Sequence, residues 1–153
     1  MKIHKLKSKI TLPVSLEEAW EFFATPSNLN EVTPKHLNFK ILSELPDKMY
    51  QGLIIEYKVH PVLGIPLHWV TEITHIEDKK FFVDEQRFGP YAFWHHQHIF
   101  TPVDGGVEMT DIVHYKLPLG FIGDLFGGWF VKKQVEGIFT HRTKVLKEKY
   151  KFN

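Results

Sequence analysis

The chain has 153 residues and a formal net charge of +1, and 43% of its residues are hydrophobic. These values are typical of one globular domain, which we expect to span residues 1–153. The small net charge and the scattered lysines argue against nucleic acid as a partner. The absence of cysteine excludes disulfides, thiolate nucleophiles and cysteine-ligated metals.

The chain begins with alternating polar and apolar residues instead of an apolar segment. No apolar run approaches the roughly 20 residues of a membrane-spanning helix. We therefore expect a cytoplasmic protein without stable membrane insertion. Aromatic residues make up 14% of the sequence. This content suits either a dense core or the wall of an apolar pocket.

The first third of the chain predicts one strand and two short helices. In Lys2–Leu12, mostly charged residues alternate with mostly apolar ones, as in a strand with one buried face. Ser15 followed by Glu18 is a capping box, which predicts a short helix over 16–24. A second short helix is expected over 27–32, before Thr33-Pro34.

Six further strands are expected, separated by proline, glycine and aspartate at the turns. They cover Phe39–Leu45, Leu53–His60, Leu67–Ile76, Lys80–Phe88, Tyr91–Thr101 and Val107–Leu117. The apolar stretch Pro61–Pro66 is expected to be a loop. Together with the first strand, these segments predict an antiparallel meander.

The last third, Pro118–Tyr150, predicts one long helix with a single wide apolar stripe, because its apolar residues recur at spacings of three and four. These residues are Ile122, Leu125, Phe126, Trp129, Val131, Val135, Ile138, Phe139 and Leu146. Strands followed by a terminal helix predict an α+β fold. We expect a curved seven-stranded antiparallel sheet around the helix from about Leu119 to Tyr150, with a ligand site between them.

The chain resembles the START-related superfamily, also called SRPBCC, which groups polyketide cyclases and dehydrases, lipid-transport proteins and birch-pollen-type allergens. The resemblance rests on Leu12–Phe23, Phe82–Gln86, Gly89–Tyr91, the aromatic and histidine residues Trp94, His96, His98 and Phe100, Met109 with Asp111, and Tyr115 with Pro118 and Gly120. The middle motifs are similar to a bacterial ligand-binding subgroup. The resemblance implies a helix-grip fold and an apolar cavity, and it leaves the substrate open. The sequence carries no cofactor fingerprint, and we expect no cofactor.

Three residues of one predicted strand, Trp94, His96 and His98, share a face because they lie two apart. If Asp104-Gly105 is a two-residue hairpin turn, Asp111 lies directly opposite His98. Such a pair can orient a ligand, transfer protons or satisfy itself inside a core. All three interpretations stay open.

The same histidines, with Asp111 or Asp84, could hold zinc or non-haem iron. The resemblance does not imply a metal, and we expect none. Asp84, Glu85 and Gln86 follow one another on the neighbouring strand, where side chains alternate between the two faces. Either Asp84 with Gln86, or Glu85, therefore shares a face with His96. Carboxylates in such a strand more often lie in solvent or pair with Arg87, and this is our expectation for them.

Our candidate ligand-binding residues are aromatic or polar and are expected to face the cavity. They are Tyr57, Trp69, Trp94, His96, His98, Asp111, Tyr115, Phe126 and Trp129. Simple core packing is an equally good interpretation of the aromatic ones. The apolar segments Pro61–Pro66 and 119–123 would form the cavity mouth, or would contact a second copy of the chain or a membrane edge.

Three functional hypotheses follow from the sequence. The first is binding or transport of a small hydrophobic ligand between the sheet and the C-terminal helix. The second is a cyclase, dehydratase or isomerase that uses His96, His98 and Asp111 for proton transfer, although no nucleophile or phosphate-binding motif favours an enzyme. The third is an interaction protein whose aromatic residues merely pack. The resembled domain also occurs joined to an epimerase-like domain, so the partners left open are such a domain or a second copy of the chain.

Overall fold

The computed structural model describes residues 2–62 and 64–153, without the side chains of residues 61, 62 and 120–126. The strands are β1 (His4–Leu12), β2 (Lys40–Ile41), β3 (Ile54–Val62), β4 (Ile65–Glu77), β5 (Phe81–Phe88), β6 (Phe93–Val103) and β7 (Gly106–Lys116). The α-helices are α1 (Leu16–Phe23), α2 (Leu29–Val32) and α3 (Gly120–Tyr150), and the two 3₁₀ turns are η1 (Pro26–Asn28) and η2 (Lys35–Leu37).

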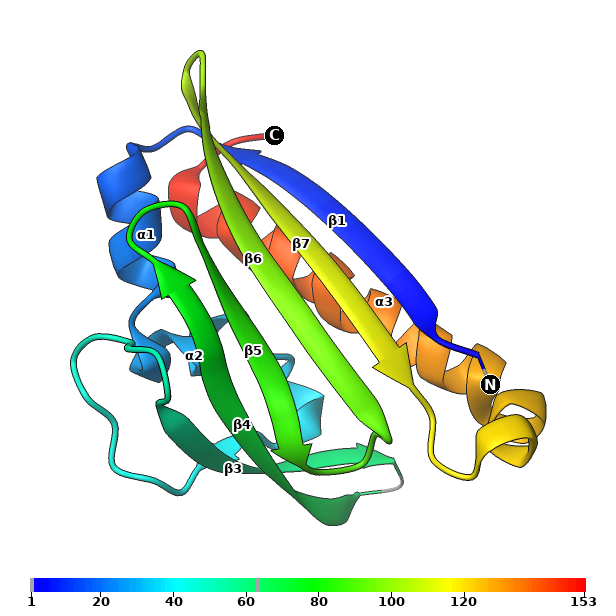
Figure 1. Ribbon diagram of the computed structural model, residues 1–153. Helices are drawn as coiled ribbons and strands as arrows, with labels where there is room; N and C mark the ends of the chain where they lie inside the picture. The colour runs from blue at the N-terminus through cyan, green and yellow to red at the C-terminus, as the bar shows by residue number, and fades with distance from the viewer. Residues whose placement is uncertain (1, 63) are drawn as a thin grey trace.

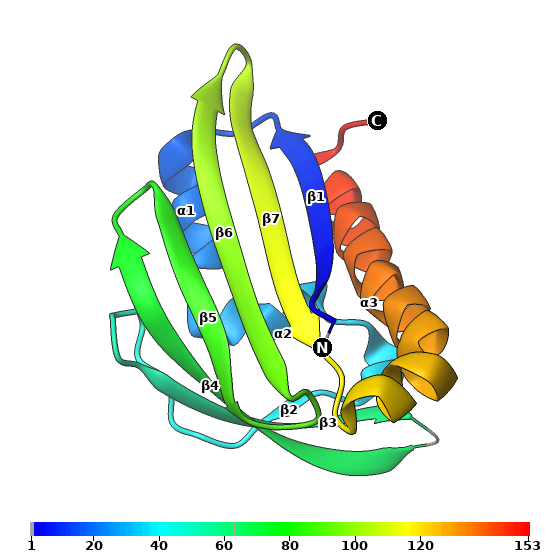
Figure 2. The ribbon, with the colours of Figure 1, turned by 45° about the vertical axis from the view of Figure 1, so that its right-hand side comes forward.

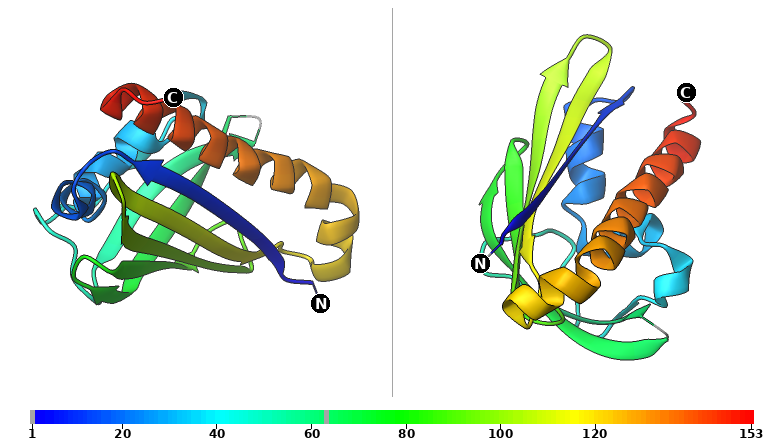
Figure 3. Two further views of the ribbon diagram at one scale, coloured as in Figure 1. Left: turned by 90° about the horizontal axis from the view of Figure 1, so that it is seen from above. Right: turned by 90° about the vertical axis from the view of Figure 1, so that its right-hand side faces the viewer.

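The strands form one antiparallel sheet in the order β1-β7-β6-β5-β4-β3-β2. The long helix α3 runs along one face of this curved sheet, and α1 and α2 lie on the same face (Figures 1 and 3). Figure 2 shows β1 beside β7 at the edge that α3 accompanies. The predicted α+β helix-grip architecture, with seven antiparallel strands and a long terminal helix, is therefore confirmed.

The turn between β6 and β7 fixes the register that the site depends on. Asp104 and Gly105 form a two-residue turn, and Gly105 has a φ of 81°, which glycine adopts without strain. Val103 pairs with Gly106, and His98 pairs with Asp111. The predicted cross-strand position of Asp111 is confirmed.

Helix α1 begins as its sequence predicts. The Ser15 hydroxyl accepts a hydrogen bond of 3.1 Å from the backbone N–H of Glu18. One face of the helix is apolar, and the Trp20 ring on this face packs edge-on against Phe82 and Phe100. The ring centroids are 6.0 and 5.3 Å apart, respectively. One end of the sheet is therefore closed by α1.

The single apolar stripe predicted for α3 is wrong. The inward face carries Val135, Phe139 and Leu146, which are buried, whereas Trp129 is 75% exposed. At 3.6 residues per turn, Trp129 points about 120° away from Val135, so these two apolar residues do not share one face of the helix. The earlier part of the stripe, residues 122–126, lies outside the described side chains.

Two further expectations are corrected at the other end of the sheet. The strand expected at Phe39–Leu45 is reduced to the two residues of β2. The apolar segment Pro61–Pro66 is not a loop, because β3 extends to Val62 and β4 begins at Ile65. Leu63 lies outside the described residues. Within the described chain, no helix is both long and apolar enough to cross a bilayer.

Two glycines are expected to respond oppositely to alanine. A Cβ on Gly106 would lie 2.0 Å from the Leu12 carbonyl oxygen, so Gly106→Ala must separate β1 from β7 and should lower the free energy of unfolding by at least about 2 kcal/mol. Gly137 is exposed on α3 with nothing within 4 Å. Gly137→Ala should raise the free energy of unfolding by about 0.5–1 kcal/mol. Urea denaturation of both variants checks this, and equal effects would contradict it.

Candidate functional site

A largely apolar cavity of about 360 Å³ lies between the sheet and the helices. This volume falls in the range of small-molecule sites, roughly 300–1,000 Å³. Its wall includes Phe22, Phe23, Leu37, Phe39, Ile55, Tyr57, Val59, Trp69, Thr71, Asp84, Tyr91, Trp94, His96, His98, Val135, Ile138, Phe139 and Arg142. Strands β3 to β6 therefore contribute one side, and α1 and α3 contribute the other.

Aromatic rings form a continuous part of this wall. Tyr57 stacks on Trp69 with ring centroids 5.8 Å apart, and Trp69 meets Trp94 edge-on at 5.3 Å. The Tyr57 hydroxyl is 2.9 Å from Thr71 Oγ1. Burial, with a smaller contribution from the charge of Asp84, raises the pKa of Tyr57, so its hydroxyl stays protonated.

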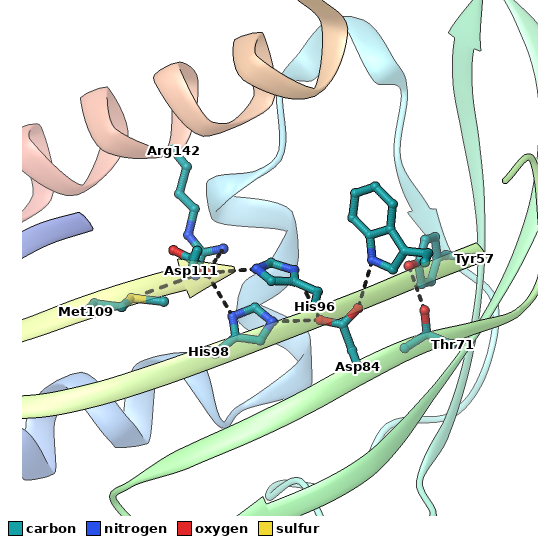
Figure 4. Close-up of polar contacts among 9 residues, drawn as sticks. Tyr57, Thr71, Asp84, His96, His98, Met109, Asp111 and Arg142 are labelled. Atoms are coloured by element: carbon teal, nitrogen blue, oxygen red, sulfur yellow. Dashed lines mark hydrogen bonds and ion pairs between the residues drawn. The ribbon is translucent and has the colours of Figure 1, made fainter. Parts of the chain in front are cut away.

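Three adjacent strands bring four titratable side chains together beside these rings. Asp84 on β5 pairs with His96 on β6, and His98 on β6 pairs with Asp111 on β7. The two imidazole rings lie side by side with centroids 3.7 Å apart. Figure 4 shows the two histidines between the two aspartates, with Arg142 approaching Asp111 from α3.

Each histidine bridges the two carboxylates. His96 has Nε2 2.8 Å from Asp111 Oδ1 and Nδ1 3.3 Å from Asp84 Oδ2. His98 has Nε2 2.6 Å from Asp84 Oδ2 and Nδ1 3.2 Å from Asp111 Oδ1. The last of these four contacts is close but is not aligned as a hydrogen bond. Because carboxylates face both nitrogens of the His96 ring, the site favours the charged imidazole of His96.

Neighbouring residues hold this cluster in place. Trp94 donates its indole N–H to Asp84 Oδ1 at 3.2 Å, and the Phe82 ring stacks on His98 at 4.1 Å. Arg142 Nη1 lies 3.4 Å from Asp111 Oδ1. His96, His98, Asp111 and Arg142 are each at most 9% exposed, so these charges interact at low dielectric.

The charges of the cluster shift its pKa values in opposite directions. Burial disfavours the charged imidazole of His96, but the charge of Asp84 and the hydrogen bonds to both aspartates outweigh it and raise the pKa of His96 to about 9. Burial also opposes ionisation of Asp84 and Asp111. The cationic groups around them (His96 for Asp84, Arg142 and His96 for Asp111) outweigh it and lower both pKa values. At neutral pH two negative charges therefore face the positive charges of His96 and Arg142.

The same residues contain a possible set of metal ligands. Asp84, His96 and His98 each bring one ligand atom within 4.8 Å of the others, and imidazole with carboxylate suits zinc. These nitrogens, however, already face carboxylate oxygens at 2.6–3.3 Å. A metal would have to break those contacts, and binding of an apolar ligand in the cavity does not require one.

The structure brings five of the nine sequence-predicted residues into the cavity wall, namely Tyr57, Trp69, Trp94, His96 and His98. Asp111 lies behind the histidines, and Tyr115 packs against Tyr91 with centroids 5.8 Å apart instead of facing the cavity. Trp129 does not line it, because its helix position turns it outward. The side chain of Phe126 lies outside the described residues.

Two site residues differ from what the sequence predicts. Asp84 is expected in solvent, yet it completes the cluster, whereas its neighbour Glu85 has the expected surface role with Arg87, at 3.6 Å. Arg142 is absent from the predicted ligand-binding residues. It lies three residues after Phe139 and four before Leu146, a spacing that matches the inward face and could have revealed it.

No protein-family model and no curated protein sequence matches the chain. Solved structures do. The Zhui aromatase/cyclase from Streptomyces sp. R1128 superposes with a TM-score of 0.72 at 13% identity, covering 98% of this chain and 94% of that one. Ara h 8.0201 gives 0.62 at 18% identity, covering 96% and 99%. The protein TTHA0849 from Thermus thermophilus gives 0.67 at 15% identity, covering 95% of each chain.

The class that the fold defines is the helix-grip class. The protein has the helix-grip fold that its sequence resemblance to the START-related SRPBCC superfamily implies, and several of the similar structures come from bacteria. At these identities the likeness establishes the fold, and the function has to be argued from the cavity itself.

Proposed function

We propose that the protein binds a small hydrophobic ligand in the cavity between the sheet and α3. The observation that carries the proposal is an apolar cavity of about 360 Å³ with one buried charged cluster in its wall. Apolar walls supply affinity, and a few polar groups orient what is bound. The similar structures include an aromatase/cyclase by name, which is consistent with a ligand cavity of this kind.

Unpaired polar atoms in the wall support the same proposal. Among the described residues, Trp69 Nε1, His98 Nδ1 and Arg142 Nε are buried without a hydrogen-bond partner, and all three residues line the cavity. A buried polar atom without a partner costs about 1–3 kcal/mol. A ligand that offers acceptors to these atoms would recover that cost.

The neutral dye N-phenyl-1-naphthylamine tests the proposal, since its fluorescence rises in apolar surroundings. The wild-type protein should bind it with a saturable signal. Ile138→Trp places an indole in the cavity from α3 and should weaken dye binding at least about tenfold. Lys144→Trp adds the same indole at an exposed position of that helix and should leave binding unchanged. Equal binding by both variants would place the dye elsewhere and remove the support for a ligand cavity.

A second candidate function is proton transfer on a bound substrate, as in a cyclase, dehydratase or isomerase. One observation favours it: His96 lines the cavity and its raised pKa, about 9, makes it a proton donor at neutral pH. His98 and Asp111 would then hold the proton in place. If this is the function, His96→Gln should abolish turnover of the natural substrate while dye binding persists.

Residues 1–153 as a single domain, a role in lipid transport, a cytoplasmic location and a homodimer or epimerase-like partner stay predictions from the sequence. The proposed ligand binding depends on none of them. It requires only the cavity and its charged wall, which lie within one chain.

A further inference from the structure

Arg142 is the one arginine in the wall of the cavity, among the described residues. It projects from α3 towards Asp111 (Figure 4), and it is 9% exposed. Its guanidinium carbon lies 4.9 Å from the ring centre of Phe23, which also lines the cavity. Ring and carboxylate together hold the guanidinium at the cavity wall.

The hydrogen bonds of Arg142 are incomplete. A guanidinium carries five N–H donors in a rigid plane. Nη1 lies 3.4 Å from Asp111 Oδ1, and Nη2 reaches only the thioether sulfur of Met109 at 3.8 Å, a weak acceptor. Nε is buried and has no hydrogen-bond partner in the described chain. Among the described residues, the edge of the guanidinium formed by Nε and Nη2 is thus left without an oxygen acceptor.

That edge has the geometry of a carboxylate receptor. Two parallel N–H groups of arginine match the two oxygens of a carboxylate, and such paired, charge-assisted hydrogen bonds are strong. The charges nearby permit an added anion, because Asp84 and Asp111 are already offset by His96 and Arg142. Away from this cluster the wall is largely apolar, so the rest of the ligand should be largely apolar too.

We infer that the ligand is an apolar monocarboxylate whose carboxylate is bound by Nε and Nη2 of Arg142. This inference rests on the proposed ligand-binding function and specifies the chemical class of the ligand. Arg142 is then the residue that selects an acid over the corresponding alcohol.

Displacement of N-phenyl-1-naphthylamine by decanoate and by 1-decanol tests the inference, because the two competitors differ only at the head group. Arg142→Lys keeps the positive charge beside Asp111 and removes the two parallel N–H groups of Nε and Nη2. It should weaken decanoate binding about tenfold or more and leave 1-decanol within about twofold of wild type. Arg142→Gln should have the same effect on decanoate, and circular dichroism verifies that both variants fold.

Lys144→Gln removes an exposed cation of the same helix and should change neither competitor. If the wild-type protein binds the dye and 1-decanol but the Arg142 variants bind decanoate as wild type does, the inference is overturned and the ligand cavity stands. If wild type binds dye and 1-decanol but not decanoate, the outcome is the same. If wild type binds neither the dye nor 1-decanol, both the proposed function and the inference are contradicted.

Discussion

Replacing Asp111 by asparagine is expected to lower the free energy of unfolding by about 3–5 kcal/mol, because breaking a buried ion pair leaves its partners charged and uncompensated. Asp111 is 3% exposed and contacts His96 at 2.8 Å and Arg142 at 3.4 Å. Asparagine keeps the size of the side chain and removes its charge. Urea denaturation at pH 7 measures the loss.

Two comparisons separate charge from packing in this experiment. Asp47→Asn makes the same change at an exposed position and should leave the free energy of unfolding within about 0.5 kcal/mol of wild type. Adding Arg142→Gln to Asp111→Asn removes the unpaired cation, so the double variant should lose less than the sum of the single losses. A loss below about 1 kcal/mol for Asp111→Asn would contradict a buried, ionised cluster.

The second large effect is a fall in stability between neutral and alkaline pH. The pKa of His96 is raised from 6.5 to about 9 in the folded protein. A raised pKa means that the folded state holds the proton more tightly than the unfolded state. The stabilisation is therefore complete below about pH 6.5 and is lost as the pH rises through about 9, a loss on the order of 3 kcal/mol.

For the carboxylates, the stabilisation of the folded state is lost as the pH falls instead of as it rises. The lowered pKa values of Asp84 and Asp111 stabilise the folded protein above their ordinary value of 3.8, and this stabilisation is lost as the pH falls below it. His114, whose pKa burial lowers, loses its smaller contribution as the pH falls below about 6.5. Stability should thus be greatest near about pH 6 and decline on both sides.

Urea midpoints measured from about pH 6 to 9 check the alkaline half of this profile. His96→Gln cannot take up the proton and should remove most of the decline above about pH 6.5. His36→Gln, at an exposed position, should retain the wild-type slope. A wild-type midpoint that stays constant over this range would mean that His96 is not held as a cation.

The face and register of the histidine strand were predictable because both follow from short-range rules. Side chains alternate along a strand, so His96 and His98 had to share a face. Asp104-Gly105 fits a two-residue turn, and this turn length sets which residue lies opposite His98. The element order followed in the same way from turn residues and hydrophobic periodicity.

The burial of Asp84 could not be predicted, because alternation shows which residues share a face and not which face the helices cover. The strand before it pairs irregularly, with register shifts between Val70 and Thr71 and between Ile73 and His75. Such shifts change which residues lie opposite one another, so the cross-strand pairing of Asp84 cannot be counted along the sequence. The ion pair of Arg142 with Asp111 depends on how α3 packs across the sheet, which no pattern within either segment contains.

Trp129 illustrates the remaining error. Its apolar side chain and helical spacing favoured an inward position, yet it is 75% exposed. Apolar residues at spacings of three and four form one stripe only while they stay on the same face of the helix, and Trp129 lies about 120° around the helix from Val135.

The pairing of β1 with β7 also orders events during synthesis. His4 pairs with Tyr115 and Leu12 with Val107, so β1 has a partner strand that follows it by about a hundred residues. A ribosome delivers residues from the N-terminus, at roughly 5–20 per second. Strand β1 must therefore wait unpaired for seconds while β2 to β6 emerge. Its lysines at positions 5, 7 and 9 are expected to discourage pairing with other chains during that interval, as lysines on an edge strand do in a finished sheet.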